Sequence, residues 1–301
     1  MMDKNHDMTS RPTTQRLPPW FKIRLTANER LANVRNLVRS NNLHTVCRSA
    51  ACPNQTECWS AGTATFLILG NICTRGCRFC SVPKGTPEGL DTDEPNRVAD
   101  AVSALNLNYV VITSVTRDDL PDGGAAIFAE TIRSVRVRNP GCRVEVLIPD
   151  FQGSETSLKT VLDAVPDVLN HNLETVPSLY PRVRPQADYE RSLALLKRAH
   201  EHGAVAKSGL MLGFGESMDE LSAVMKDLMH AGCSILTLGQ YLQPSKMHLR
   251  VEKYYHPDEF EALRKEALSL GFRHVVAGPL VRSSYHAEQY GTVRSPDMRS
   301  E

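Results

Sequence analysis

Two groups of three cysteines lie close together in the first third of the chain and carry its strongest chemical signal. The first group is Cys47, Cys52 and Cys58, and the second is Cys73, Cys77 and Cys80. Their spacings differ, C-x₄-C-x₅-C in the first and C-x₃-C-x₂-C in the second. An iron–sulfur centre usually takes four protein ligands, so three thiolates leave one coordination position open for chemistry. The two groups therefore predict two cooperating metal centres.

Disulfide bonds and structural zinc are the simpler interpretations of these cysteines. The chain opens without the apolar run of a secretory signal, which argues against an oxidising compartment. Structural zinc takes four ligands from paired knuckles, but only Cys77 and Cys80 have knuckle spacing, and His44 is the only histidine nearby. Iron–sulfur binding is favoured over both interpretations. Cys142 and Cys233 stand singly beside glycines and are expected to be packed small residues.

The composition excludes several kinds of partner. The chain has 35 Lys and Arg against 34 Asp and Glu, a formal net charge of +1, and no run of basic residues. This balance predicts no nucleic-acid partner. No stretch approaches the roughly 20 apolar residues that cross a membrane. Exposed thiolates suit a reducing compartment, so we expect a cytoplasmic protein that makes no membrane contact.

Composition and periodicity divide the chain into four parts. Residues 1–16 are polar, show no apolar periodicity and are expected to be disordered. Residues 17–63 form an N-terminal extension with a short helix over residues 28–40, followed by the first cysteine group. Residues 64–285 form one catalytic domain, and residues 286–301 form a C-terminal tail.

From residue 64 onward, short apolar runs typical of buried strands alternate with amphipathic helical patterns. The predicted strands cover residues 65–69, 109–115, 144–148, 168–173, 205–212, 235–238 and 274–277. The predicted helices cover residues 97–105, 124–137, 189–202, 218–231 and 257–270. This alternation is typical of a parallel sheet covered by helices. Seven strands, with no G-x-G-x-x-G after the first, favour an α/β fold with a partial (β/α) barrel of the TIM type.

The second cysteine group resembles the signature of the radical S-adenosylmethionine (SAM) superfamily. It follows the first predicted strand, and barrel enzymes build their active sites from the loops after strands. The resemblance implies a [4Fe–4S] cluster held by Cys73, Cys77 and Cys80, whose free iron binds SAM. An electron from that cluster cleaves SAM and yields a 5′-deoxyadenosyl radical, which abstracts an unactivated hydrogen. Phe79 stands where the superfamily places an aromatic residue against the adenine, although it could equally pack beneath the cluster.

The resemblance also points to SAM contacts at the ends of later strands. Asp122, Gly123 and Gly124 lie where the superfamily has a glycine-rich stretch that holds the methionyl amine, because glycine lets the backbone approach a ligand. Alone, they would be a turn before a helix. Asn172 and Glu174 are alternate residues on one face and could hold ribose hydroxyls. The simpler interpretation is a structural polar pair.

Two further stretches are ambiguous in the same way. Residues 207–216, which include Lys207 and Met211, resemble the superfamily segment that runs along the adenine, but their glycines could also mark a strand-to-helix turn. Arg117, Asp118 and Asp119 follow the second predicted strand. They could contact SAM or substrate, but an ion-paired loop is the simpler prediction.

The first cysteine group narrows the resemblance to the lipoyl synthase family. Its C-x₄-C-x₅-C spacing is similar to that family's auxiliary-cluster motif, and Arg282-Ser283-Ser284-Tyr285 is similar to its C-terminal motif. Further similar segments are residues 43–47, 64–66, 110–115, 117–119 and 239–245. The resemblance implies that a serine supplies the fourth ligand of an auxiliary [4Fe–4S] cluster. Ser284 is our prediction and Ser283 the alternative, since adjacent residues of an extended segment point opposite ways.

The resemblance to this family implies a reaction and its partners. Two sulfur atoms enter at C6 and C8 of an octanoyl chain, which is attached to a lysine of a lipoyl carrier protein. Two SAM molecules are consumed, and the auxiliary cluster is the sulfur donor. The carrier would be the glycine-cleavage H protein or a lipoyl domain of a 2-oxoacid dehydrogenase, and the electron donor a ferredoxin or flavodoxin. The preferred carrier, the physiological reductant, the oligomeric state and the role of Arg282 stay open.

Three alternatives compete with this interpretation. Other radical SAM sulfur-inserting or methylthiolating enzymes lack a short upstream cysteine group combined with a terminal Arg-Ser-Ser-Tyr. A non-catalytic iron–sulfur protein for electron transfer or redox sensing needs four protein ligands per cluster and no SAM pocket. A zinc-structured binding protein would contain zinc but no iron.

Overall fold

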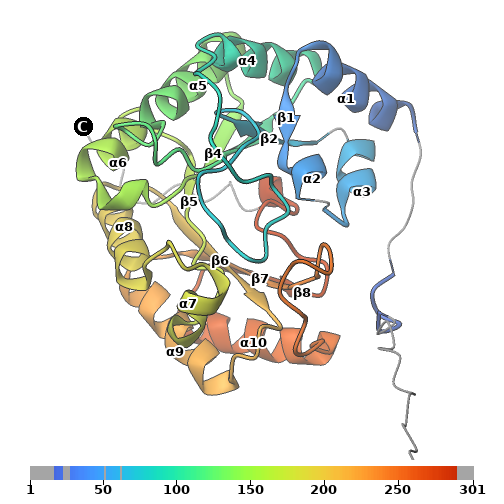
Figure 1. Ribbon diagram of the computed structural model, residues 1–301, viewed down its shortest axis with the longest axis vertical. Coiled ribbons are helices and arrows are strands. Elements are labelled where there is room, and N and C mark those ends of the chain that lie inside the picture. The colour runs from blue at the N-terminus through green and yellow to red at the C-terminus, as the bar shows by residue number, and fades with distance from the viewer. Residues whose placement is uncertain (1–16, 23–27, 51, 62, 290–301) are drawn as a thin grey trace, which may run out of the picture.

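The structure is a computed structural model that describes residues 17–22, 28–50, 52–61 and 63–289 (Figure 1). The predicted disorder of residues 1–16 and most of the predicted tail therefore lie outside the described residues. No helix in the described part of the chain is both long and apolar enough to cross a membrane.

An eight-stranded sheet forms the frame of the molecule. Its strands are β1 (His44–Thr45), β2 (Thr65–Ile68), β3 (Tyr109–Ser114), β4 (Arg143–Leu147), β5 (Val168–Asn170), β6 (Ala206–Leu212), β7 (Ile235–Gln240) and β8 (His274–Gly278). They pair in chain order, β1 antiparallel to β2 and all later neighbours parallel. Because β1 and β8 are the two edges, the sheet curves without closing, and the predicted partial barrel is confirmed.

Helices cover the outer face of this sheet (Figure 1). The helices are α1 (Glu29–Ser40), α2 (Val46–Ser49), α3 (Gln55–Ser60), α4 (Glu94–Ala104), α5 (Ala125–Arg138), α6 (Glu155–Leu162), α7 (Tyr180–Val183), α8 (Tyr189–Glu201), α9 (Met218–His230) and α10 (Pro257–Leu270). Of these, α2 and α3 lie inside the outer layer (Figure 1). Short 3₁₀ turns are η1 (Phe151–Gly153), η2 (Pro177–Leu179) and η3 (Ala287–Gln289).

Local sequence explains where these elements begin and end. Ser217 caps α9 and forms a reciprocal capping box with Glu220, which satisfies free backbone N–H groups of the first turn. In α10, Pro257 opens the helix, and Gly271 takes the left-handed conformation just after its last turn, with φ of 113°. Every residue of β7 is buried, because helices cover one face of the strand and its other face lies in the barrel interior.

The structure adds elements that periodicity did not predict. β1, α2 and α3 are two, four and six residues long, too short for a periodic pattern. Helix α6 follows β4 and completes a strand–helix unit. β5 ends at Asn170, three residues before the predicted end, and Glu174 has a positive φ of 68°. This break in the strand lets the polar residues after it leave the sheet plane.

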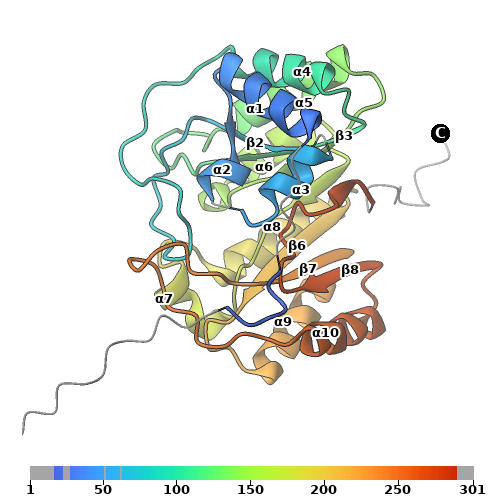
Figure 2. The same cartoon turned by 90° about the vertical axis from the view of Figure 1, so that its right-hand side faces the viewer.

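The C-terminal segment after β8 crosses the open side of the sheet (Figure 2). It starts from one sheet edge and contacts the N-terminal extension beside the other. Asn54 donates a hydrogen bond to the Leu280 carbonyl at 2.7 Å, and Thr65 donates to Ser284 Oγ at 2.9 Å. A side chain on Gly239 would overlap the Val281 carbonyl oxygen, so this segment lies directly against β7. The segment therefore bridges elements that sheet hydrogen bonds leave apart.

Candidate active site

A cavity of about 490 Å³ opens at the carboxyl ends of the barrel strands. All three cysteines of the second group line it, together with Phe79, Asn172, Glu174 and Met211. These residues come from the loop after β2, the chain after β5, and β6 itself. The structure thus brings seven of the predicted site residues around one space that is large enough for a cofactor.

Buried ion pairs fix the loop that carries Cys73, Cys77 and Cys80. Arg75, only 5% exposed, donates to both oxygens of Asp118 at 2.6 and 2.8 Å and to Asp150 at 2.6 Å. Asp150 is itself held by Arg191 at 3.3 Å. Such bidentate contacts are geometrically specific, so they orient the loop as well as anchor it. The neighbouring Arg117 pairs with Asp119 at 2.8 Å, as an ion-paired loop predicts.

The cysteine side chains lie in an environment that suits metal ligands. The backbone N–H groups of Arg75 and Thr116 point at Cys73 Sγ, at 3.5 and 3.3 Å. Burial raises the pKa of the Cys80 thiol to about 12. The free thiol is therefore protonated at neutral pH, and metal binding must displace that proton.

The first cysteine group lines a second, smaller cavity of about 140 Å³. Cys47, Cys52 and Cys58 contribute from α2, the chain after it and α3, and Ser283 and Ser284 contribute from the C-terminal segment. Burial raises the pKa of the Cys58 thiol to about 12, and the neighbouring Cys47 and Cys52 add to this shift. Three cysteines and two serines thus line one space, although they come from opposite ends of the chain.

The two cavities are neighbours and share part of their wall. Both are lined by Val46, Ala50, Leu147, Arg282 and Ser283. The two groups of cysteines therefore face adjoining spaces.

The donor set fits iron–sulfur cubanes better than single metal ions. Among the described residues, no three His, Cys, Asp or Glu side chains are placed to hold one metal ion. A zinc site requires such convergence, because all its ligands bind one atom. A [4Fe–4S] cubane places each thiolate on a different iron, so its three cysteines remain apart.

Asn172 and Glu174 have the geometry expected of ligand-binding groups. Asn172 Nδ2 donates to Glu174 Oε1 at 3.1 Å, while Asn172 Oδ1 is buried without a hydrogen-bond partner among the described residues. Burial raises the pKa of the Glu174 carboxyl, which the nearby Arg184 partly offsets. A buried polar atom without a partner is costly, so a bound ligand with a hydroxyl donor would satisfy it.

Four predicted cofactor residues do not reach this cavity. Lys207 lies inside the barrel, 0% exposed, with its Nζ 2.8 Å from Glu145 Oε1. Asp122 accepts hydrogen bonds from the N–H groups of Gly124 and Ala126 and thereby opens α5. Gly123 and Gly124 pack against Phe151 and Leu69, and neither place leaves room for a Cβ. These glycines allow close packing of backbone rather than contact with the cavity.

The structure places further polar residues at the cavity that motif comparison missed. Arg184 donates to the carbonyls of Asn172 and Leu173 at 2.8 and 3.0 Å, and its Nε is buried without a partner among the described residues. His171 lies beside it, with Nδ1 2.8 Å from the Ile148 carbonyl oxygen. Their place in the chain could have indicated this location, because both residues follow β5 at the end of the sheet where the cysteines lie.

His171 predicts a specific loss of stability in acid. Burial, with nearby Arg184 next in importance, lowers the pKa of His171 to about 4 from an ordinary value of 6.5. The stabilising effect is complete above pH 6.5 and is lost as the pH falls through 4. The stabilisation lost in this way is about 3 kcal/mol of unfolding free energy. His171→Gln should therefore reduce the drop in unfolding free energy between pH 7 and pH 4 by about this amount, measured by urea denaturation of the cluster-free chain. If the unfolding free energy drops equally in the parent and in the variant, the acid-induced loss does not come from His171.

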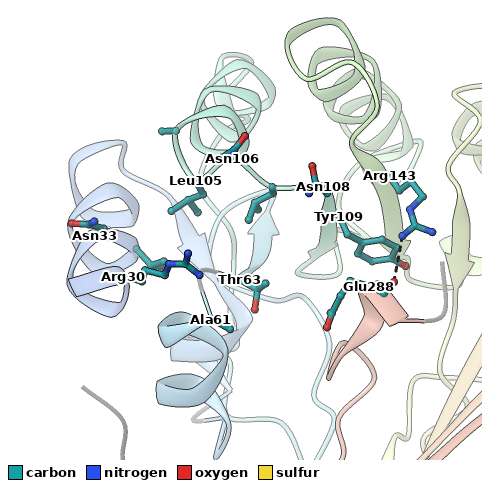
Figure 3. A pocket seen from close by; sticks show the side chains of 13 residues that line it. Arg30, Asn33, Ala61, Thr63, Leu105, Asn106, Asn108, Tyr109, Arg143 and Glu288 are labelled. Carbon is teal, nitrogen blue, oxygen red and sulfur yellow. Dashed lines mark hydrogen bonds between the residues drawn. The ribbon is translucent and has the colours of Figure 1, made fainter. Parts of the chain in front are cut away.

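A third hollow, of about 560 Å³, lies at the opposite end of the strands and contains none of the predicted site residues (Figure 3). Arg30, Asn106 and Asn108 line it, and the Arg143 guanidinium lies over the Tyr109 ring, 5.3 Å from its centre. Its lining contains no cysteine. The six grouped cysteines therefore line only the two cavities described above, among the cavities of the described residues.

The cysteine-lined cavity at the carboxyl ends of an open parallel barrel defines a radical SAM enzyme, and the family model "Radical SAM superfamily" matches residues 67–228. Solved structures agree in fold. SuiB of Streptococcus suis bound to S-adenosylmethionine gives a TM-score of 0.54 at 10% identity, covering 72% of this chain and 51% of that one. Methylornithine synthase gives 0.51 at 13% identity, covering 84% and 82%.

Sequence relatives identify the family within this superfamily. Lipoyl synthase of Halalkalibacterium halodurans is 56% identical over 277 residues, covering 91% of each chain. Lipoyl synthase of Koribacter versatilis is 55% identical over 282 residues, covering 93% of each. The chain belongs to the lipoyl synthase family.

Proposed function

We propose that the protein inserts two sulfur atoms, at C6 and C8 of an octanoyl chain on a lysine of a carrier protein, and so forms the lipoyl group. It is a radical SAM sulfurtransferase that uses two [4Fe–4S] clusters and SAM. One observation carries the proposal: the cavity of the second cysteine group and the cavity of the first share a wall. Hydrogen abstraction and sulfur transfer require such neighbouring sites.

The two cysteine groups are proposed to bind two clusters with different roles. We assign Cys73, Cys77 and Cys80 to the cluster that binds SAM, and Cys47, Cys52 and Cys58 to the cluster that donates sulfur. When bound, the first cluster supplies the electron for SAM cleavage and the second supplies the sulfur. Ser284 is proposed as the fourth ligand of the second, with Ser283 as the alternative. Alkoxide matches this iron less well than thiolate does, so it could leave as the donor cluster is dismantled.

The remaining cavity residues would hold SAM and shape the space around it. Asn172 and Glu174 are proposed to bind the ribose hydroxyls, since Asn172 Oδ1 lacks a partner among the described residues. Phe79 and Met211 would contact the adenine, and both pack against the aromatic cluster of Phe214 and Tyr241. We give Lys207 and residues 122–124 no SAM contact, because they support the barrel instead.

The substrate is an octanoylated carrier protein and the reaction consumes electrons from a reductant. We propose the glycine-cleavage H protein or a lipoyl domain of a 2-oxoacid dehydrogenase as carrier, and a ferredoxin or flavodoxin as reductant. The cytoplasm is the proposed compartment, because it keeps the thiols reduced. Residues 17–63 are proposed as the cluster-binding extension, and residues 64–285 as the catalytic domain.

A mass measurement tests the function. The iron- and sulfide-loaded protein is incubated without oxygen with SAM, dithionite and a peptide that carries N6-octanoyl-lysine. The expected result is formation of 5′-deoxyadenosine and a peptide that has gained two sulfur atoms. SAM cleavage without sulfur gain would support another radical SAM reaction. If SAM is not cleaved at all, a non-catalytic iron–sulfur protein is favoured, and zinc without iron would favour a zinc-structured protein.

A further inference from the structure

Four exposed basic residues stand on the two loops that enclose the SAM-cluster site from outside. They are Arg78, Lys84, Lys246 and Arg250, and we call them the basic rim. Residues 73–85 and 243–251 contain no acidic residue, whereas the whole chain is almost balanced at 35 basic and 34 acidic residues. Among the described residues, no side chain of the basic rim forms an ion pair. These four positive charges are therefore not neutralised by acidic side chains within the described part of the chain.

Backbone contacts join the two loops into one surface. Leu249 donates to the Arg78 carbonyl at 3.3 Å, and His248 Nε2 lies 3.1 Å from the Cys80 carbonyl oxygen. Lys84 lies on the other arm of the cysteine loop, where it forms a backbone bridge with Cys73. The basic rim is thus built on the same backbone that carries the cluster ligands.

An apolar side chain stands within this charged surface. Met247, next to Lys246, is 92% exposed, the largest exposure among the large apolar residues of the described chain. Exposed methionine is common at surfaces that bind a partner by adaptable packing. A charged border around an apolar contact is the usual composition of a protein–protein interface.

We propose that the basic rim and Met247 form the docking surface for the reductant, an acidic protein that carries one electron at low potential. The inference rests on the proposed function. The partner gives up one electron for each SAM cleaved and is oxidised by that loss. Because one product consumes two SAM molecules, it requires two deliveries. Opposite charges steer such a short-lived encounter, and interfaces of this kind are small.

The position of the basic rim favours the reductant over the octanoylated carrier. The carrier must send its lysine arm into the cavity, but none of the four basic residues, nor Met247, lines that cavity. Arg78 instead follows Cys77 directly, on the outside of the cluster loop. A partner held there would contact the backbone of the cluster loop through side chains that do not line the cavity, whereas Gln243 and Pro244 of the second loop do line it.

A charge-reversal pair tests the proposal in the loaded enzyme. Lys246→Glu/Arg250→Glu alters the basic rim, and Lys197→Glu/Lys226→Glu makes the same net change on the outer helices α8 and α9. The rate of 5′-deoxyadenosine formation is measured with limiting flavodoxin hydroquinone and, separately, with dithionite and methyl viologen. The rim variant should lose about tenfold with flavodoxin, the size typical of lost electrostatic steering. It should keep the dithionite rate and the iron content, and the control variant should keep both rates.

The possible outcomes distinguish a failure of the docking surface from a failure of the proposed function. Equal flavodoxin-driven rates in the two variants would overturn the docking surface while leaving the function intact. A raised KM for the octanoylated carrier in the rim variant, with dithionite as reductant, would assign the surface to the carrier and also overturn the proposal. If the parent forms no lipoyl product with dithionite, the proposed function itself fails.

Discussion

Cys77→Ala is expected to abolish SAM cleavage and product formation together, whereas Cys52→Ala should abolish sulfur insertion alone. Cys77 lines the larger cavity, where SAM would bind, and Cys52 lines the smaller one. Each variant should retain about half of the bound iron, since one of two clusters remains. The measurements are 5′-deoxyadenosine release, peptide mass and iron content, all in the absence of oxygen.

The two serines provide matched controls for this separation. Ser284→Ala should resemble Cys52→Ala in iron content and product, while Ser283→Ala should lose less of both. Loss of SAM cleavage in Cys52→Ala would show that the cavities do not act separately. Equal losses from the two serine variants would rule out a single serine ligand.

Lys207→Met is expected to lower the unfolding free energy by about 3–5 kcal/mol, because it leaves a buried carboxylate without its cation. Glu145, 1% exposed, accepts hydrogen bonds from Lys207 at 2.8 and 3.0 Å, from Tyr109 at 2.6 Å and from Asn170 at 3.2 Å. Burial and the Glu145 charge both raise the pKa of the Tyr109 hydroxyl, so it remains a donor. Anaerobic urea denaturation of the loaded protein measures the loss.

The double variant Glu145→Gln/Lys207→Met is the control for this pair. It removes both charges and keeps an acceptor for Tyr109 and Asn170, so it should cost less than Lys207→Met alone. An unchanged unfolding free energy together with a raised KM for SAM would contradict the structural role and return Lys207 to the cofactor site.

Local patterns were sufficient to predict the barrel strands, because near-continuous apolar runs and helical periodicity are short-range properties. The spacing of Cys73, Cys77 and Cys80 likewise placed three cysteines on one loop after β2. Lys207 could not be assigned in this way. Its partner, Glu145, precedes it by 62 residues, and only the register of β4, β5 and β6 brings the two together.

The smaller cavity shows a second limit of sequence reasoning. Its cysteines were visible as a group, but the contact between Thr65 and Ser284 spans 219 residues. Only the resemblance to a family connected the first cysteine group with the serines near the C-terminus. In the structure, the segment after β8 crosses the open side of the curved sheet and so brings these residues together. Gly123 and Gly124 show that a motif suited to close backbone approach can also serve packing, because a Cβ at either position would meet Phe151 or Leu69.

The bridging C-terminal segment also sets an order of assembly during translation. Cys47, Cys52 and Cys58 leave the ribosome early, but Ser284 follows every strand of the barrel, and domains fold as the chain emerges. The contacts of Asn54 and Thr65 with this segment are among the most distant along the chain and should form late. A nascent or prematurely ended chain would therefore lack the part of the smaller cavity's wall that Ser283 and Ser284 supply.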